Sequence, residues 1–317
     1  MRRYQIRQKI IIDTDPGQDD AVAILLALAS RELEVLGITC VAGNVELSLT
    51  TINALKICEL AGRSDVSVYA GADTPLKRKL ITAKHVHGRT GLDGTDLPAP
   101  KAQISKMHAV DYIIETILSA KRKEITICAL GPLTNIALAF IKEPKIIPMI
   151  KELVLMGGGF FEGGNITPAA EFNIYVDPEA ASKIFQSRVP IVMIPLDLTH
   201  QVLATKEFIA RVGSLGSKTG KAVAELLKFF GRYDSKKYGS DGAPLHDPNV
   251  IAYLLKPHYY QGKYINVEIE LNSELTLGMT VADWWKVTEK KENVKFIRKV
   301  KEKAVLNLIA DQLGGLP

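Results

Sequence analysis

The sequence predicts an α/β protein with an open, mostly parallel sheet flanked by helices, and a small antiparallel addition near the C-terminus. Short apolar or β-branched runs alternate with longer helical patterns through most of the 317 residues, the signature of parallel βαβ units. Several strand candidates end in glycine or polar residues, as at Ala42–Asn44 and Gly157–Gly159. Because no linker or repeat interrupts the pattern, we expect one domain over residues 1–317.

The expected elements follow in chain order. Strands are expected at Lys9–Asp13, Val35–Val41, Val66–Ala70, Glu124–Leu130, Glu152–Met156 and Val189–Pro195. Helices are expected between them at Ala21–Ala29, Leu47–Ala61, Met107–Ala120, Leu133–Ile141 and Pro178–Gln186. Two long loops, residues 79–101 and 157–172, are expected to be functional, because loops of this length inside a compact domain usually are.

The last third of the chain has a different pattern. It reads as helical from Thr205 to Phe230, then as polar and glycine-rich from Gly231 to Pro244. Tyr264–Leu271 alternates like an antiparallel edge strand, and Val300–Leu313 is expected to close the chain as an amphipathic helix.

Composition and charge exclude several classes of function. No apolar run reaches the length of a membrane span. The basic segment Met1–Arg7 leads into a strand and lacks a signal-peptide core, so we expect a cytoplasmic protein. The net charge of +5 comes partly from Lys77–Lys79 and Lys286–Lys303, which read as solvated surface without a nucleic-acid motif. The three cysteines lie in apolar patterns and are expected to be buried and reduced.

An acidic turn at the start of the chain is its most informative feature. Four aspartates, Asp13, Asp15, Asp19 and Asp20, directly follow the apolar run Ile10–Ile12. In an open α/β sheet, ligand sites lie just outside the carboxyl ends of strands. One pair of such carboxylates about 4 Å apart repels by roughly 4 kcal/mol at an effective dielectric of about 20. The turn therefore needs a bound cation, shared protons, or both.

Two simpler explanations of the turn are insufficient. Helix capping explains Asp19 or Asp20, but not Asp13 and Asp15 as well. A calcium loop of the EF-hand type fails because its glycine and glutamate positions hold Gln18 and Ile24. Any cation here must therefore be held by ligands from distant segments.

Several segments, taken together and in order, resemble the nucleoside hydrolase family, in particular its inosine-uridine preferring and pyrimidine-specific branch. The resemblance runs from about Lys9 to Leu271 and rests on Asp13–Ala21, Val41–Asn44, His87–Gly88, Thr90–Gly94, Gly131–Asn135, Leu155–Gly158, Gly164–Asn165, Ala170–Asn173 and His246–Pro248.

The resemblance implies hydrolysis of the N-glycosidic bond of a ribonucleoside to free base and ribose, as a step in nucleoside salvage. It also implies a Ca²⁺ ion bound by the carboxylates of Asp15, Asp20 and Asp247 and by the carbonyl of Leu130. Ca²⁺ suits such a set because it takes six to eight oxygen ligands. Asp15 would be the general base, and the substrate contacts would be Asp19, Asn44, Met156, Asn165, Glu171, Phe172 and Asn173.

The group that protonates the leaving base is left open among His246, His87 and Tyr238. His246 is the obvious donor, because a histidine pKa ordinarily lies near working pH. Tyr238 lies in the segment Arg232–Gly242, which is expected to close over the base as a lid. We expect a preference for uridine and cytidine; the alternative is a purine or broad-specificity enzyme.

Other readings are weaker. A zinc site built from His85, His87 and His246 conflicts with the oxygen ligands of the acidic turn. A metal-dependent phosphohydrolase lacks a basic residue for phosphate at a later strand end. A non-catalytic nucleoside-binding protein has no need for a water-activating base. By resemblance we expect a homo-oligomer, a dimer or tetramer, that acts on a small ribonucleoside and binds neither nucleic acid nor membrane.

Overall fold

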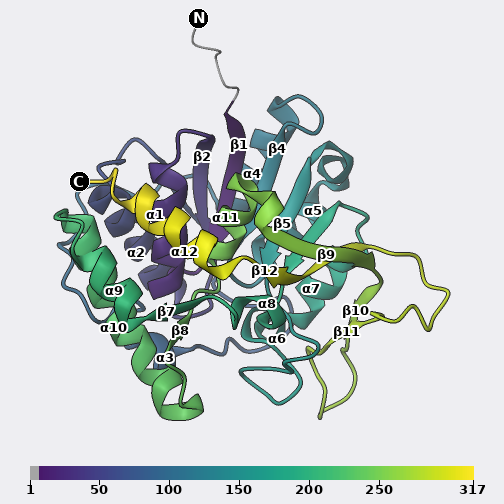
Figure 1. Ribbon diagram of the computed structural model, residues 1–317. Coiled ribbons are helices and arrows are strands. Elements are labelled where there is room, and N and C mark those ends of the chain that lie inside the picture. The colour runs from purple at the N-terminus through teal and green to yellow at the C-terminus, as the bar shows by residue number, and fades with distance from the viewer. Residues whose placement is uncertain (1–6) are drawn as a thin grey trace, which may run out of the picture.

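The computed structural model describes residues 7–317, apart from the side chain of Tyr238, so the expectation about the N-terminus falls mainly on residues outside this part. An eight-stranded sheet runs in the order β3-β2-β1-β4-β5-β6-β12-β9 (Figure 1). Its strands are β1 (Gln8–Thr14), β2 (Leu33–Cys40), β3 (Val68–Ala70), β4 (Ile125–Ala129), β5 (Glu152–Met156), β6 (Ile191–Ile194), β9 (Tyr260–Ile265) and β12 (Val294–Val300). Only β9, at one edge, pairs antiparallel to its neighbour in this sheet.

All six strands predicted for the parallel sheet are present, with bounds that differ by no more than two residues from those predicted. The order of the strands reverses beside β1, because β2 lies on one side of it and β4 on the other. Two loops therefore leave in opposite directions at this point and open a crevice at the carboxyl ends of the strands. The predicted fold class is confirmed.

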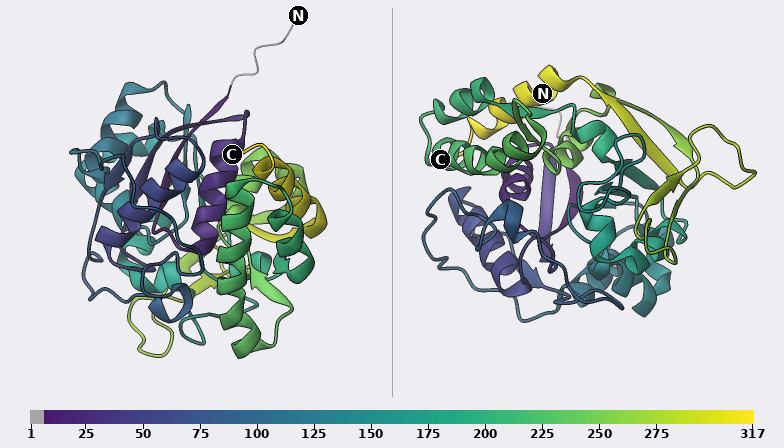
Figure 2. Two further views of the ribbon diagram at one scale, coloured as in Figure 1. Left: turned by 90° about the vertical axis from the view of Figure 1, so that its left-hand side faces the viewer. Right: turned by 90° about the horizontal axis from the view of Figure 1, so that it is seen from below.

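Helices cover both faces of the sheet (Figure 2). On one face lie α1 (Gln18–Ala29), α2 (Leu47–Leu60), α11 (Pro248–Leu255) and α12 (Glu302–Leu313), packed against Ile10 and Ile12. On the other lie α4 (Ala109–Ser119), α5 (Thr134–Lys142) and α7 (Pro178–Phe185), packed against Ile11. The apolar run of β1 is buried on both faces because successive side chains of a strand point to opposite sides.

The segment after Thr205 differs from its prediction. Two helices, α9 (Lys206–Gly213) and α10 (Lys218–Tyr238), are separated by a turn, and α10 continues eight residues beyond the expected end. Gly231 lies inside α10, where it faces the backbone of Ala243. The helix ends only at Gly239, whose φ of +64° is the left-handed conformation of a helix C-cap. The irregular, glycine-rich segment expected from Gly231 to Pro244 is therefore wrong in its first half, which is helical, while closure of Arg232–Gly242 over the base stays a prediction.

The expected edge strand Tyr264–Leu271 is also wrong in its bounds. The chain divides into β9 and β10 (Val267–Ile269), and β10 pairs with β11 (Thr280–Ala282) in a separate antiparallel sheet. Asn293 enforces the break, because its side chain bonds to both the N–H and the carbonyl of Val267. The charged segment Lys286–Lys303, which was expected to be solvated surface, contains the strand β12. This strand lies in the main sheet between β6 and β9.

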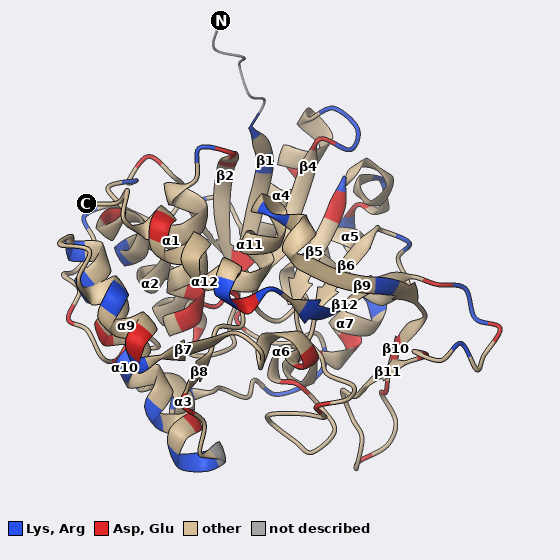
Figure 3. Cartoon of the chain, viewed as in Figure 1, with Lys and Arg blue, Asp and Glu red and all other residues tan. Residues whose placement is uncertain are grey.

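The remaining elements are short and lie in loops. They are α3 (Lys84–His87), the 3₁₀ helix η1 (Pro144–Met149), α6 (Phe172–Val176), α8 (Leu196–Thr199), β7 (Leu203–Thr205), β8 (Gly242–Pro244) and the 3₁₀ helix η2 (Pro257–Tyr259). Lysines and arginines are distributed over several outer elements, including α9 and α10 (Figure 3). Within residues 7–317, no helix combines the length and apolar character needed to cross a bilayer.

Candidate active site

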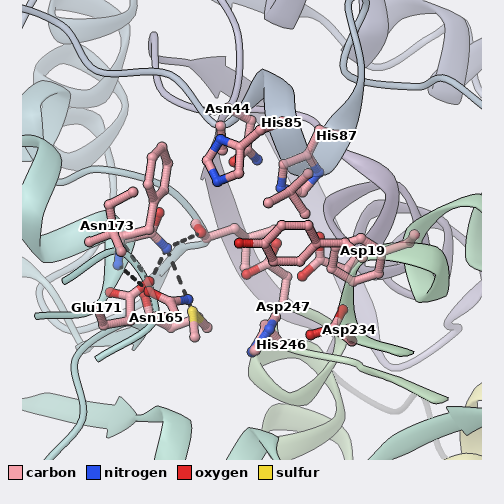
Figure 4. A pocket seen from close by; sticks show the side chains of 18 of the residues that line it. Asp19, Asn44, His85, His87, Asn165, Glu171, Asn173, Asp234, His246 and Asp247 are labelled. Carbon is pink, nitrogen blue, oxygen red and sulfur yellow. Dashed lines mark hydrogen bonds between the residues drawn. The ribbon is translucent and has the colours of Figure 1, made fainter. Parts of the chain in front are cut away.

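The acidic turn lies at the point where the strand order reverses. It joins the end of β1 to the start of α1, and Leu130, the residue after β4, lies beside it, where its N–H donates to the carbonyl of Asp13. A cavity at this edge of the sheet is lined by side chains from loops that are far apart in sequence (Figure 4). Its lining includes all the predicted substrate contacts, His87, His246, Leu130 and Asp247.

The first aspartate of the turn has a structural position. Asp13 is fully buried, and its Oδ1 accepts hydrogen bonds from Thr39 Oγ1 at 2.5 Å and Asn135 Nδ2 at 2.8 Å. Burial raises the pKa of Asp13 to about 7, although both hydrogen bonds act to lower it. Asp13 does not line the cavity and instead joins the ends of neighbouring strands.

Asp20 and Asp15 use their oxygens differently. Asp20 accepts hydrogen bonds from Thr14 Oγ1 at 2.5 Å and from the N–H of Gly17 at 2.9 Å, so it caps α1. Asp15 Oδ2 accepts from the N–H of Asn44 at 2.7 Å. Its other oxygen, Oδ1, is buried and has no hydrogen-bond partner among the described residues. A buried carboxylate oxygen left in this state is costly unless a ligand, water or proton satisfies it.

The acidic side chains converge into a candidate cation site. Oxygens of Asp19, Asp20 and Asp247 lie within 4.8 Å of one another, and all three residues are buried. Burial and the charge of Asp20 raise the pKa of Asp15 well above its ordinary value. Burial first, and then the neighbouring aspartates, do the same for Asp247. No lysine or arginine lines this cavity in the described part of the chain, so a bound cation is the compensation that this donor set suits.

Of the predicted metal ligands, the structure groups Asp20 with Asp247, while Asp15 lies outside this group and does not line the cavity. Asp19, predicted to bind the sugar, lies in the carboxylate group with Asp20 and Asp247. Asp247 occupies the N-cap position of α11, yet its side chain makes no capping hydrogen bond. A plain helix cap therefore does not explain Asp247, whose carboxylate lines the cavity beside Asp20. The group of candidate ligands contains no histidine within residues 7–317, which disfavours the zinc alternative.

The predicted sugar contacts also hold one another in place. Asn173 Nδ2 donates to the carbonyls of Leu130 at 2.7 Å and Met156 at 3.2 Å. Glu171 accepts from the N–H groups of Gly158 and Asn173, each at 2.9 Å, and so caps α6. Burial raises the pKa of Glu171 to about 7. These contacts fix the loop 157–171 against the ends of β4 and β5.

The other predicted contacts belong to the same rim. Asn165 Oδ1 accepts from the N–H of Phe172 at 2.9 Å, and both residues line the cavity. Asn44 Nδ2 donates to the carbonyl of Asp15 at 3.1 Å and to Asp20 Oδ2 at 3.2 Å. In Figure 4, Asn165, Glu171 and Asn173 lie together, while His85, His87 and Asn44 lie on a different side.

Two histidines, the buried His87 and the half-buried His246, lie on either side of Phe230 in the cavity. Phe230 stacks on His87 with ring centroids 5.4 Å apart and lies edge-on to His246 at 6.4 Å. His246 Nδ1 is 2.8 Å from the hydroxyl of Thr199. Burial, followed by the nearby His200 and His87, lowers the pKa of His246 to about 3. The pKa of His246 thus lies below the ordinary histidine value that the sequence led us to expect, and its role as proton donor stays a prediction.

Several cavity residues were missed or left unassigned by the sequence reasoning. His200, Phe230, Tyr233 and Asp234 line the cavity. The last three lie on α10, where one face of a helix turns to the cavity, but the predicted end at Phe230 hid this periodicity. Tyr238 is the last residue of α10, and its side chain is not among those described.

An acidic, amide-lined cavity at the switch point of a parallel sheet defines a protein that acts on a small hydroxyl-rich molecule. Comparisons with known proteins specify the class further. A sequence model of the family described as inosine-uridine preferring nucleoside hydrolase matches residues 10–307. The chain is 47% identical over 306 residues to a protein named pyrimidine-specific ribonucleoside hydrolase RihA from Shewanella sp. (strain ANA-3), covering 96% of each chain.

Solved structures give the same result. A plant nucleoside hydrolase superimposes with a TM-score of 0.92 at 35% identity, over 97% of this chain and 99% of the other. A purine-preferring ribonucleoside hydrolase from Gardnerella vaginalis superimposes with a TM-score of 0.91 at 32% identity, over 97% and 98% of the two chains. The chain belongs to the inosine-uridine preferring nucleoside hydrolase family, and it is an enzyme that hydrolyses nucleosides.

Proposed function

We propose that the protein hydrolyses the N-glycosidic bond of ribonucleosides with the help of Ca²⁺, that it favours uridine and cytidine, and that it serves nucleoside salvage. The observation that carries this proposal is the unpartnered, buried Oδ1 of Asp15 beside the cluster of Asp19, Asp20 and Asp247. The absence of lysine and arginine from the described lining of the cavity disfavours a phosphate ester as substrate.

Asp15, Asp20, Asp247 and the backbone carbonyl of Leu130 would hold the ion. Their oxygen-only donor set is the kind that Ca²⁺ prefers. When bound, such an ion lowers the pKa of a coordinated water and polarises the sugar hydroxyls.

The protein's own side chains then have separate tasks. Asp15 takes a proton from the attacking water at Oδ1, the oxygen that has no other partner. Asp19, Asn44, Met156, Asn165, Glu171, Phe172 and Asn173 surround the ribose. Their carboxylates also place negative potential beside a sugar that becomes oxocarbenium-like as the base leaves. The rim of hydrogen bonds between loops keeps these groups fixed before the substrate arrives.

His87 and His246, which line the cavity, are candidate partners of the departing base, and Tyr238, the last residue of α10, is kept as a third candidate. Support for a pyrimidine comes from the relative named as pyrimidine-specific, which is 47% identical to this chain. The purine-preferring structural neighbour, at 32% identity, keeps purine or broad specificity as the alternative.

A substrate panel tests the proposal. The purified protein is incubated with uridine, cytidine, inosine, adenosine and guanosine, and the reducing sugar released is measured with and without a strong chelator. We expect release of ribose, fastest from the pyrimidine nucleosides, and loss of activity with chelator that added Ca²⁺ restores. Turnover that is indifferent to chelation in metal-free protein would refute the metal-dependent part.

We further propose that the protein is cytoplasmic and forms a homo-oligomer. The three cysteines are buried and unpaired, which suits a reducing compartment such as the cytoplasm. We infer a homo-oligomer, a dimer or tetramer, and light scattering of the purified protein gives its mass directly.

A further inference from the structure

Gln18, the residue between the proline-glycine pair and the two aspartates of the acidic turn, contacts a loop far away in sequence. Its Nε2 donates hydrogen bonds to the backbone carbonyls of His87 and Asp93, both at 3.0 Å. Carbonyl oxygens only accept hydrogen bonds, so the NH₂ group of this amide must face them. The orientation of the Gln18 amide is thereby decided, and its Oε1 must point the other way.

That oxygen meets the ring of His87. Gln18 Oε1 and His87 Nδ1 are 2.7 Å apart, and the amide oxygen has no proton to give. His87 Nδ1 must therefore carry the proton and donate it. A neutral imidazole has one N–H and one lone pair, so the lone pair belongs to Nε2. The hydrogen-bond network thus determines the tautomer of His87.

The surroundings of the ring keep it neutral. His87 is 7% exposed and stacks on Phe230. Burial, followed by the positive charges of His85 and Arg232, lowers the pKa of His87 to about 3. The position of the ring is also confined, because a Cβ added at Gly17 would lie 2.3 Å from Nδ1. Glycine at residue 17 is thus required for the ring to approach the turn.

The Nε2 atom opens to the cavity. No described residue makes a hydrogen bond to it. Among the described residues, the side-chain nitrogen and oxygen atoms that are enclosed and have no hydrogen-bond partner are Asp13 Oδ2 and Asp15 Oδ1, so His87 Nε2 is not an enclosed atom. His87 Nε2 is therefore accessible, and the open space beside His87 is the cavity it lines. Figure 4 shows His87 at the rim with His85, on the opposite side from His246 and Asp234.

We infer that Gln18 is a positioning residue that holds His87 as the Nδ1–H tautomer, so that His87 offers a hydrogen-bond acceptor to the nucleobase. The site then recognises a base with an N–H group on the edge that faces His87, such as N3–H of uracil or the amino group of cytosine. His87 does not protonate the leaving base, and that task falls to another group of the site. This inference rests on the proposed function only for the identity of the ligand.

The tautomer is measured directly by NMR. The full-length protein, labelled with ¹⁵N in histidine, is studied at neutral pH, and the His87 signals are assigned by their loss in His87→Gln. Nitrogen shifts and long-range couplings to the ring protons distinguish a protonated from an unprotonated nitrogen. We expect Nδ1 protonated and Nε2 unprotonated. A protonated Nε2 would overturn the inference, and this measurement needs no variant of Gln18 that folds.

Kinetics test the recognition of the base. Gln18→Met keeps the length of the side chain and removes both the acceptor and the donors, so the Nε2–H tautomer becomes accessible. The KM for uridine should rise by about three- to tenfold, the usual effect of losing one hydrogen bond. The KM for 4-nitrophenyl riboside, whose leaving group has no N–H, should change by less than about twofold on the same grounds. An equal rise for both substrates would refute recognition through His87.

The control is Gln261→Met, which makes the same change at an exposed position of β9. It should alter neither KM. Failure of the inference is separable from failure of the proposed function. A protein that releases ribose from no nucleoside, yet has His87 in the Nδ1–H form, refutes the function alone. An active enzyme with a protonated Nε2 refutes only the inference.

Discussion

At the scale of single residues, the aspartates of the acidic turn differ in the hydrogen-bond partners of their carboxylate oxygens. Asp13 is bonded to Thr39 and Asn135, away from the cavity. Asp20 caps α1. Asp13 and Asp15 each keep one buried oxygen without a described partner, but Asp15 is the one on which the charges of Asp20 and Asp19 act. Adjacent carboxylates can therefore carry structural and chemical roles without exchanging them.

Asp15→Asn tests the free oxygen. The N–H of Asn44 continues to require an acceptor at the Oδ2 position, so the new NH₂ group replaces Oδ1 and turns an acceptor into a donor. We expect kcat to fall by about 10²- to 10⁴-fold, the usual contribution of a general base. Thermal unfolding of the metal-free variant should occur at the same or a higher temperature, since a buried charge is removed.

The control for this change is Asp65→Asn, an exposed aspartate paired with Arg63, which should leave kcat unchanged. If Asp15→Asn retained more than about a tenth of the activity, a loss far smaller than a general base normally supplies, Asp15 would not be the base.

Thr199→Val tests the setting of His246. The hydroxyl of Thr199 is the group that bonds to His246 Nδ1, and valine has the same shape without it. We expect kcat for uridine to fall by about tenfold, because a misplaced ring can no longer assist the departing base. Activity on 4-nitrophenyl riboside should be nearly unchanged, because its leaving group needs no proton. Thr199→Ser should behave like the wild type; equal losses on both substrates would show a structural effect instead.

At the scale of elements, the ends of β1, β2 and β3 are tied together by a single buried amide, that of Asn135. Asn135 Nδ2 donates to Asp13 Oδ1 at 2.8 Å and to the carbonyl of Cys40 at 3.0 Å, and its Oδ1 accepts from the N–H of Ala72 at 2.8 Å. These partners follow or end β1, β2 and β3, while Asn135 itself starts α5. The crevice therefore depends on a residue that does not line it.

Asn135→Ala should destabilise the fold. It leaves three buried polar groups with fewer partners, each worth about 1–3 kcal/mol when unsatisfied. We expect the midpoint of thermal unfolding to fall by several degrees, at roughly 2–4 °C per kcal/mol for a chain of this size class. Circular dichroism measures it, and Asn272→Ala in an exposed loop provides the control. A change no larger than that of the control would contradict the anchoring role.

Local signals predicted these elements well and long-range ones poorly. The strands of the parallel sheet were visible as apolar runs, and the acidic turn was visible because its aspartates are adjacent in sequence. Gln18 was not, because its partners His87 and Asp93 lie 69 and 75 residues away. The strand β12 was hidden by its lysines and arginines, which are exposed or half-buried, while Val294 and Phe296 are buried. The helix α10 was cut short because Gly231 was read as a stop.

At the scale of the whole molecule, the metal-free protein contains several buried carboxyl groups whose pKa values are raised. Burial raises the pKa of Asp19 to about 8 and that of Glu171 to about 7, with Asp20 adding to the shift of Asp19. The folded state thus binds more protons than the unfolded state at weakly acid and neutral pH. Stability from these groups is present in full below the ordinary carboxyl pKa and is lost as pH rises through the folded values.

Stability of the metal-free protein should therefore fall as pH rises from about 4 to about 8, the range between the ordinary and the raised pKa values. Added Ca²⁺ should raise the unfolding temperature more at the upper end of this range than at the lower end, because ionised carboxylates bind it. Differential scanning calorimetry with and without chelator measures both. An increase with Ca²⁺ that is the same throughout the range would contradict a carboxylate site.

The position of β12 has a consequence for how the protein is made. β9 precedes β12 in the chain but pairs in the main sheet only with it, and β12 in turn covers the margin of β6. During synthesis, all the candidate site residues through Asp247 leave the ribosome while the edge of β6 is still unpaired. An unpaired strand edge can pair with a strand of another chain, which leads to aggregation. A chain truncated before Val294 would thus contain every proposed catalytic group but would lack β12, the strand that pairs with the edge of β6.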